Sequence, residues 1–463
     1  AVHQAVQAVH GPYPVRAIKL WALGLVALVL LGVVALAARG AATPWAAAGA
    51  GMVGAALALQ PMTADSPLLG LKTETLAMAF VFPGLVASAA SARAQGWRRS
   101  GLAGLSGLAF GLAIATKQTY ALVPVFVACC LMASMGSTSR ALDFARAALP
   151  AATLGCVLPL ASMAALFALQ GRANEFLGNL LIYPAVYGGP AEGDAMQRAA
   201  WKAAALASDL ARTPAPALLA LAGAVMAWSQ RPRLWTEEEA AAWGAVAALL
   251  LGIALSPIYC AYHLLPVWLL LAALGGLTWA RLARSPASPS ASSAALPATL
   301  LLVLATLHVS QVWWTEGGRR GGRPDAGATP AMTADALAGS RTGWVLGMWP
   351  EFYVQRGLLP ASGILYPWAL PGTPDNPLFR RPDPNSPWAP WLAAAQARNL
   401  AQLYRDFEHT PPDVVALVEP LARHPGSDRQ ADVPGLDRWL MQRCLEAPPL
   451  RDGNGRPTRL FDC

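Results

Sequence analysis

Two acids and two lysines stand close to the ends of apolar runs. Asp65, Lys72 and Glu74 lie in the stretch PMTADSPLLGLKTETLAMAF, and Lys117 interrupts the apolar run GLAFGLAIATKQTYALVP. An acid at the mouth of a helix bundle can act as a general base or can orient a hydroxyl group. A lysine in such a place can bind a phosphate group as a point charge. These residue types therefore predict chemistry that involves a hydroxyl and a phosphate.

A third polar group follows in the stretch SPIYCAYHLLP, which contains Tyr259, Tyr262 and His263. Each candidate also has an ordinary structural explanation. Lys117 can extend its charge to a membrane interface, and Glu74 can complement the dipole of the helix that it begins. Asp65 fits an ordinary turn residue, and Lys72 fits a solvated side chain. The third group, Tyr259, Tyr262 and His263, fits an interfacial aromatic belt. Several such residues on one side of a membrane are more informative than any one of them.

The composition is that of a helical membrane protein. The chain has 463 residues, of which 55% are hydrophobic and 13% charged, and its mean hydropathy is +0.40. Soluble domains carry about 25% charged residues, and the deficit here lies in the first 315 residues, where long apolar runs recur. The net charge of +8 forms no basic stripe with interleaved aromatic residues, which argues against a nucleic-acid partner.

Ten apolar runs are candidate membrane spans, because about 20 helical residues cross a bilayer of about 30 Å. The runs are 17–38, 44–60, 74–92, 101–116, 118–136, 147–169, 214–230, 237–255, 262–280 and 294–312. As one helix, the stretch from Gly101 to Met135 would be about 52 Å long, too long for one crossing. We therefore expect Lys117 at the turn of a helical hairpin, near a membrane surface.

Alternation of these spans gathers most of the basic loops on one side. That side holds Arg39, Arg93, Arg98, Arg99, Arg140, Arg146, Arg231, Arg233, Arg281 and Arg284. The positive-inside rule makes it cytoplasmic. The exported side then receives residues 61–73, Lys117, the loop 170–213, residues 256–261 and the tail from 316. The loop 170–213 carries four basic residues and is an exception to the rule.

We expect two domains: a transmembrane domain over 1–315 and a soluble exported domain over 316–463. In the tail, the apolar segments GWVLGMW (343–349) and DVVALVE (413–419) predict buried strands. Between them, AAAQARNLAQLYRDFE (393–408) predicts a helix with one apolar face. Cys444 and Cys463 can pair if the tail is exported, although their spacing alone does not establish it. The other four cysteines lie in or beside apolar runs and predict ordinary buried residues.

The pattern resembles a known family. The stretches ETLAMAFVFPGLVA, GLAGLSGLAFGLAIATKQTYALVP and YHLLPVWLLLAAL, with an arginine-rich loop after the first, are similar to GT-C membrane glycosyltransferases of the protein-mannosyltransferase and aminoarabinose-transferase type. In the tail, GWVLGMWPEFYVQRGLLPASGILYP and LYRDFEHTPPDVVALVEP are similar to the exported tail of bacterial members. The resemblance implies a mainly α fold, a polytopic transmembrane bundle of GT-C type followed by a small exported α/β domain, in a bacterial inner membrane.

The resemblance also implies a reaction: inverting transfer of a sugar from a polyprenyl-phosphate donor to a glycan, lipid or protein acceptor at the exported face. It makes Glu74 and Asp65 the catalytic acids and places Lys117, with Lys72 and His263, around the donor phosphate. The substrate pocket would contain Tyr259, Tyr262, Glu351 and Tyr353. No cofactor is certain, no metal site is predicted, and dependence on a divalent metal stays open.

One departure from the family matters. Its acidic pair after the first span is missing here, because no acid precedes Arg16. We expect the chain to be truncated at its N-terminus, with the principal base upstream. The alternatives are a membrane transporter or lipid-linked-sugar flippase, or a catalytically inactive GT-C relative. A transporter would be expected to hold ionisable groups near the membrane midplane.

Overall fold

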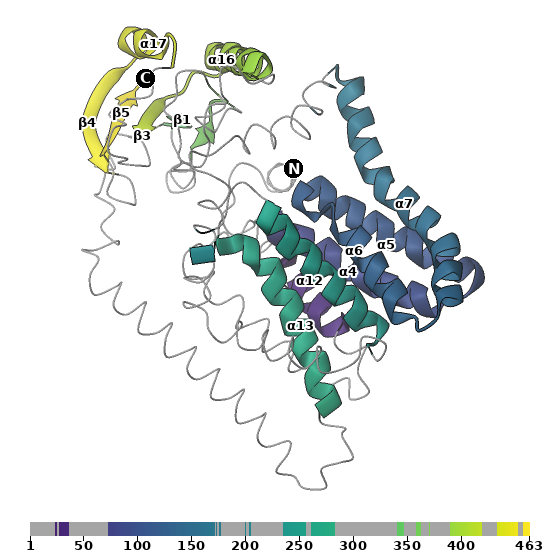
Figure 1. The fold of residues 1–463 in the computed structure, drawn as a ribbon. Coiled ribbons are helices and arrows are strands. Elements are labelled where there is room, and N and C mark those ends of the chain that lie inside the picture. Colours follow the sequence, from purple (N-terminus) through teal and green to yellow (C-terminus); the bar gives the residue numbers. More distant parts are fainter. Residues whose placement is uncertain are drawn as a thin grey trace. The chain divides into compact units, whose positions relative to one another are not determined.

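The computed structural model describes two groups of residues. The first covers 24–36 except 26, 73–171, 235–255 and 261–282, with the single positions 173, 176, 200, 203 and 204. The second covers 340–346, 358–362, 370, 389–418, 433–451 and 457–463. The chain divides into two compact units, one mostly from residues 19–317 and the other mostly from residues 318–463. The first is helical and the second is built around a sheet (Figure 1).

In the described part of the helical unit, six longer helices lie beyond residue 72. They are α4 (Thr73–Arg93), α5 (Gly96–Thr116), α6 (Val123–Ser134), α7 (Thr138–Leu169), α12 (Glu237–Leu255) and α13 (Leu265–Leu282). Two short 3₁₀ turns, η2 (Gln118–Tyr120) and η5 (Ala261–Leu264), precede α6 and α13. Among the described residues, three helices are long and apolar enough to cross a membrane: Glu74–Arg93, Thr138–Leu169 and Glu237–Leu255. Shorter apolar helices include Ala27–Leu36.

Glycines bring helices α5 and α7 into close contact. A Cβ atom at Gly107 would lie 1.9 Å from the carbonyl oxygen of Ala152, and one at Gly111 would lie 2.4 Å from that of Cys156. At Gly155, on α7, a Cβ would lie 2.2 Å from the Gly104 carbonyl oxygen. Close approach of two backbones through small residues is the usual packing of helices in membranes. Any side chain on this seam would push the two helices apart.

Helix α12 is packed in the same way against the segment that follows α5. A Cβ at Gly244 would lie 2.7 Å from the carbonyl oxygen of Phe126 on α6, and one at Gly252 would lie 3.2 Å from that of Thr119 on η2. The second contact holds the C-terminal half of α12 against the turn that follows Lys117.

The second unit contains a five-stranded sheet in the order β2-β1-β3-β5-β4. Its strands are β1 (Thr342–Leu346), β2 (Leu359–Pro360), β3 (Val414–Val418), β4 (Leu445–Arg451) and β5 (Pro457–Asp462), and its helices are α16 (Ala389–His409) and α17 (Leu436–Arg443). Strand β1 pairs in parallel with β2 and β3, whereas β5 pairs antiparallel with β3 and β4. The mixed sheet and its helices confirm an α/β unit in the tail.

Aromatic side chains form the centre of this unit. Phe407 of α16 lies with its ring centroid 5.4 Å from Trp344 of β1 and 4.8 Å from Trp439 of α17. A disulfide joins Cys444, directly after α17, to Cys463 at the end of β5. The bond closes a segment of the sheet unit that contains the antiparallel pair β4 and β5.

Most predicted elements in the described residues are confirmed, with shifted ends. The run 74–92 is α4, 237–255 is α12, and the two tail strands and their helix are present. Helix α7 begins at Thr138, not at 147, because the side chain of Ser137 accepts a hydrogen bond from Arg140 N–H and caps a polar first turn. Helix α6 begins at Val123, not at 118, because the chain first makes η2.

Other predictions have different outcomes. Cys129 is exposed, so the prediction of a buried residue is wrong there; it lies on the surface of α6. Cys130 and Cys156 are partly exposed. The runs 44–60, 214–230 and 294–312 lie outside the described residues, as do residues 17–23, 26, 37 and 38 of the run 17–38. The predicted boundary between the domains at 315 and 316 also lies there and stays a prediction.

Candidate functional site

Glu74, Lys117 and His263 come together at one end of the helical unit. Glu74 begins the first turn of α4 and is 2% exposed. Its carboxylate forms an ion pair with the Lys117 ammonium, and its Oε1 lies 3.9 Å from His263 Nε2. An acid at a helix N-terminus is favoured by the helix dipole, and the lysine supplies the opposite charge. The site is thus a buried carboxylate next to one cation and one imidazole.

The backbone explains why Lys117 lies in this place. Helix α5 ends at Thr116, and Lys117 has extended backbone angles, φ −156° and ψ 119°. Its N–H donates to the Ala113 carbonyl oxygen at 2.9 Å, and its own carbonyl accepts from Tyr120 N–H at 3.2 Å. Lys117 therefore closes one helix and opens the η2 turn. This confirms the predicted position of Lys117 at a break between two helices.

A small pocket surrounds these side chains. It has about 310 Å³ of empty space, counting the part that opens outward. Its lining comes from α4, from η2 and the residue before it, from the C-terminal half of α12, from η5 and from the start of α13. The lining residues are Glu74, Lys117, Thr119, Tyr120, Leu249, Gly252, Ile253, His263 and Pro266. The arrangement combines an acid, a base and a cation with an apolar wall.

The remaining predicted site residues are not placed. Asp65, Lys72, Tyr259, Glu351 and Tyr353 lie outside the described residues. The backbone of Tyr262 is part of η5, but its side chain also lies outside the description. Their assignments to catalysis, to phosphate binding and to the substrate pocket stay predictions.

Tyr120 lines the pocket, although it is not among the site residues predicted from the sequence. The structure buries it to 1% exposure in the pocket lining. The signal that could have identified it is its position three residues after Lys117, in the same break between two apolar runs.

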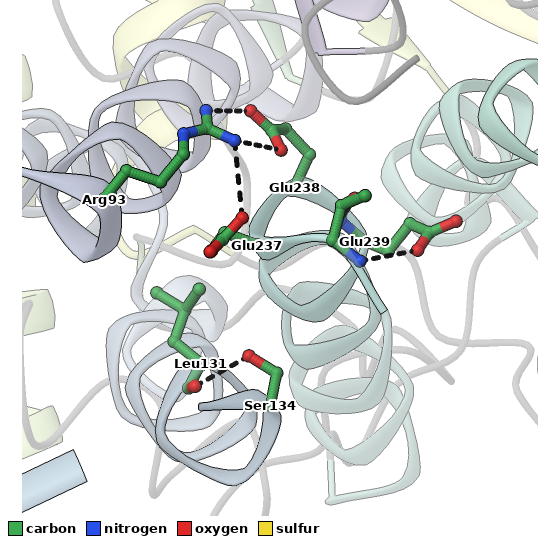
Figure 2. Close-up of polar contacts among 7 residues, drawn as sticks. Arg93, Leu131, Ser134, Glu237, Glu238 and Glu239 are labelled. Carbon is green, nitrogen blue, oxygen red and sulfur yellow. Dashed lines mark hydrogen bonds and ion pairs between the residues drawn. The ribbon is translucent and has the colours of Figure 1, made fainter. Parts of the chain in front are cut away.

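A second polar cluster lies at the other end of α4. The Arg93 guanidinium contacts both carboxylate oxygens of Glu238, one of them at 2.8 Å, and lies 3.4 Å from Glu237 (Figure 2). Glu238 is fully buried at the start of α12. Thr236 and Glu239 bond reciprocally, each side chain accepting from the other's N–H, which is a capping box for α12. Arg93 was interpreted only as a topology marker, and its partner was not foreseen.

The two clusters lie at opposite ends of the bundle. Helix α4 carries Glu74 in its first turn and Arg93 in its last. Glu238 begins α12, whereas His263 follows the end of α12. Helices α4 and α12 therefore run in opposite directions. The arginine-rich end and the Lys117 end are separate, in agreement with the alternation that the sequence predicted.

Comparison with known proteins supports this fold. No family model matches the chain, and no curated protein sequence matches it. Among solved structures, the chain is similar in fold to a helical membrane protein. One of the matching structures is ArnT from Cupriavidus metallidurans, crystallised bound to undecaprenyl phosphate. The TM-score is 0.55 at 14% sequence identity, over 98% of this chain and 86% of ArnT.

Proposed function

We propose that this chain is a membrane glycosyltransferase that moves a sugar from a polyprenyl-phosphate donor to an acceptor, with inversion at the transferred carbon. The observation that carries the proposal is the placement of Glu74, Lys117 and His263 in one pocket at a single end of the bundle. The similarity in fold to ArnT, whose crystal structure contains undecaprenyl phosphate, supports a lipid-linked donor.

The proposed chemistry follows from charge. The leaving group is an anionic polyprenyl phosphate, so a cation that contacts it stabilises the charge that develops as the glycosidic bond breaks. Lys117 has that role, and His263 is the second basic group of the described pocket. The acceptor oxygen attacks the anomeric carbon from the side opposite the phosphate. A base must accept its proton, and Glu74 assists that base, which lies elsewhere in the protein.

The proposed orientation places the Lys117 end at the exported face, with the tail on the same side. The disulfide between Cys444 and Cys463 supports an exported tail, because such bonds persist in oxidising compartments. In the same proposal, residues 1–315 form the membrane domain and 316–463 the exported domain. The acceptor is a glycan, a lipid or a protein.

The test is donor binding and transfer with Lys117→Met. The purified full chain is titrated with undecaprenyl phosphate in detergent, and sugar transfer is measured with the protein in its native membrane. A charge-assisted contact to phosphate is worth about 1.5–3 kcal/mol, so we expect binding that is about tenfold to hundredfold weaker. Lys117→Arg should retain part of the affinity, since the two cations differ in shape. An unchanged affinity in Lys117→Met would contradict the proposal.

A further inference from the structure

The pocket contains a buried hydroxyl group whose role the ion pair does not explain. The Tyr120 side chain is 1% exposed and lines the pocket together with Glu74, Lys117 and His263. Among the residues that the structure describes, its hydroxyl oxygen has no hydrogen-bond partner. A buried polar group without a partner destabilises a protein, and such groups are rare enough to require an explanation. Phenylalanine would fill the same space without that cost.

The local backbone directs Tyr120 and Lys117 to the same place. The two residues are joined by the hydrogen bond from Tyr120 N–H to the Lys117 carbonyl, three residues apart. Lys117 directly precedes the short turn, and Tyr120 is its last residue. The turn itself is held by α12, since Gly252 allows close approach to the Thr119 carbonyl. Both side chains line the same pocket, so a ligand that enters it meets Lys117 and Tyr120 together.

We infer that Tyr120 is a donor-binding residue whose hydroxyl group donates a hydrogen bond to an oxygen of the donor phosphate. This inference rests on the function proposed above. The phenol supplies a hydrogen-bond donor that needs an acceptor, and the phosphodiester of the sugar donor supplies two non-bridging oxygens with that capacity. Before the sugar donor binds, the charge of Lys117 is already matched by Glu74. An uncharged hydrogen-bond donor such as the Tyr120 hydroxyl adds affinity for the phosphate without adding a cation that Glu74 would also attract.

The test is the substitution Tyr120→Phe, which removes only the oxygen atom. The full chain is purified in detergent, and its thermal unfolding and its binding of undecaprenyl phosphate are measured. Without ligand, we expect an unfolding midpoint equal to or above that of the parent, because a buried unpaired group has been removed. Binding should be about tenfold to hundredfold weaker, as expected for a hydrogen bond to a charged group. Undecaprenol, which lacks the phosphate, should bind both proteins equally.

A matched control is Tyr404→Phe in the sheet unit. The hydroxyl of Tyr404 donates to the Pro434 carbonyl oxygen at 2.7 Å, so the same chemical change removes a bond that is already made. This variant should lose some thermal stability and keep the parent's affinity for undecaprenyl phosphate. It separates a loss of the ligand contact from a general effect of deleting a tyrosine hydroxyl.

The outcomes distinguish this inference from the proposed function. If the parent binds undecaprenyl phosphate and Tyr120→Phe binds it equally well, Tyr120 is not a phosphate ligand. If the variant loses affinity only for the sugar-loaded donor, the hydroxyl contacts the sugar and the inference is wrong. If the parent itself does not bind undecaprenyl phosphate, the proposed function and this inference both fail.

Discussion

In the proposed reaction, the ion pair between Glu74 and Lys117 has two opposing effects on donor binding. It is buried, and it forms an ion pair with the lysine that would contact the donor phosphate. A phosphate that enters the pocket must therefore share the Lys117 ammonium with Glu74. The ion pair holds the lysine in position before the donor arrives, and the same pairing reduces the charge that is available to the donor.

This competition gives a prediction for Glu74→Gln. The substitution keeps the shape and removes the negative charge, so we expect tighter binding of undecaprenyl phosphate, by about tenfold if the contact is worth about 1.4 kcal/mol. Transfer should nevertheless fall, because the acid that assists the acceptor is gone. Titration and transfer rates on the same preparation would show the two effects. Weaker binding together with unchanged transfer would contradict this assignment.

The structure also changes what Lys117→Met should do to stability. From the sequence alone, the variant is expected to fold at least as well as the parent, since the cost of placing a lysine near a membrane disappears. The ion pair reverses this expectation, because the variant leaves a buried carboxylate without its nearest cation. We expect a lower unfolding midpoint, restored at least in part by the double variant Glu74→Gln and Lys117→Met. The single and double variants would be compared by thermal unfolding in one detergent.

In the sheet unit, Asp413 makes the local stability depend on pH. Burial opposes ionisation of its carboxylate, but hydrogen bonds from the N–H groups of Arg341 (2.6 Å) and Thr342 (2.8 Å) outweigh that effect, so the pKa of Asp413 lies below its ordinary value of 3.8. The contribution of ionised Asp413 to the stability of the folded unit is complete above the ordinary pKa, and it is lost as pH falls through the lower pKa of the folded state. Hydrogen exchange of peptides from β1 and β3, corrected for intrinsic rates, should show this loss.

The variant Asp413→Asn provides the control for this measurement. It should weaken the protection of β1 and β3 at neutral pH and should remove the loss of protection in acid. Equal acid sensitivity in the variant would assign the effect to another carboxylate.

At the scale of elements, the seam between α5 and α7 is the most sensitive contact. Gly107→Ala places a Cβ within 1.9 Å of a backbone oxygen that has no freedom to rotate away. The gain of about 1 kcal/mol in helix propensity cannot compensate for that overlap, so we expect a marked loss of folded protein. Gly101→Ala is the matched control on the same helix, because nothing lies within 4 Å of its Cβ position. Fluorescence-detected size-exclusion chromatography would compare the two.

Several elements could be predicted because charged residues flank their apolar segments. Helix α4 lies between Lys72 and Arg93, and α12 begins at three consecutive glutamates, so the change from charged to apolar residues marks where these helices begin or end. The first nine residues of α7 could not be found in this way, since they are polar and depend on the cap at Ser137. Hydropathy measures transfer into lipid and says little about a helix that continues into water.

At the site, the sequence predicted which residues meet but not how they pair. Alternation of the spans placed Glu74 and Lys117 on the same side, and the structure puts them in contact. The burial of Tyr120 and the partner of Arg93 depend on α12, which is more than a hundred residues away in the sequence. No local pattern specifies contacts over that separation.

For the whole molecule, the proposed orientation can be tested by accessibility. Met441 is 85% exposed on α17, and Trp97 is 80% exposed in the first turn of α5. In a background without the unpaired cysteines, Met441→Cys should react with an impermeant maleimide in intact spheroplasts. Trp97→Cys should react only after permeabilisation. The opposite result would invert the proposed topology, and reaction at both positions would mean that the membrane was not intact.

Ion pairs hold helix α4 to its neighbours at both of its ends. Glu74 anchors its first turn to Lys117, and Arg93 anchors its last turn to the buried Glu238. Its 21 residues correspond to about 30 Å, close to the thickness of the hydrocarbon core. The two anchors fix the vertical register of α4, so a bilayer of different thickness cannot be matched by sliding this helix past its neighbours. The bundle must tilt as a unit or deform the lipid around it, and the pocket then keeps its shape in thin and thick membranes alike.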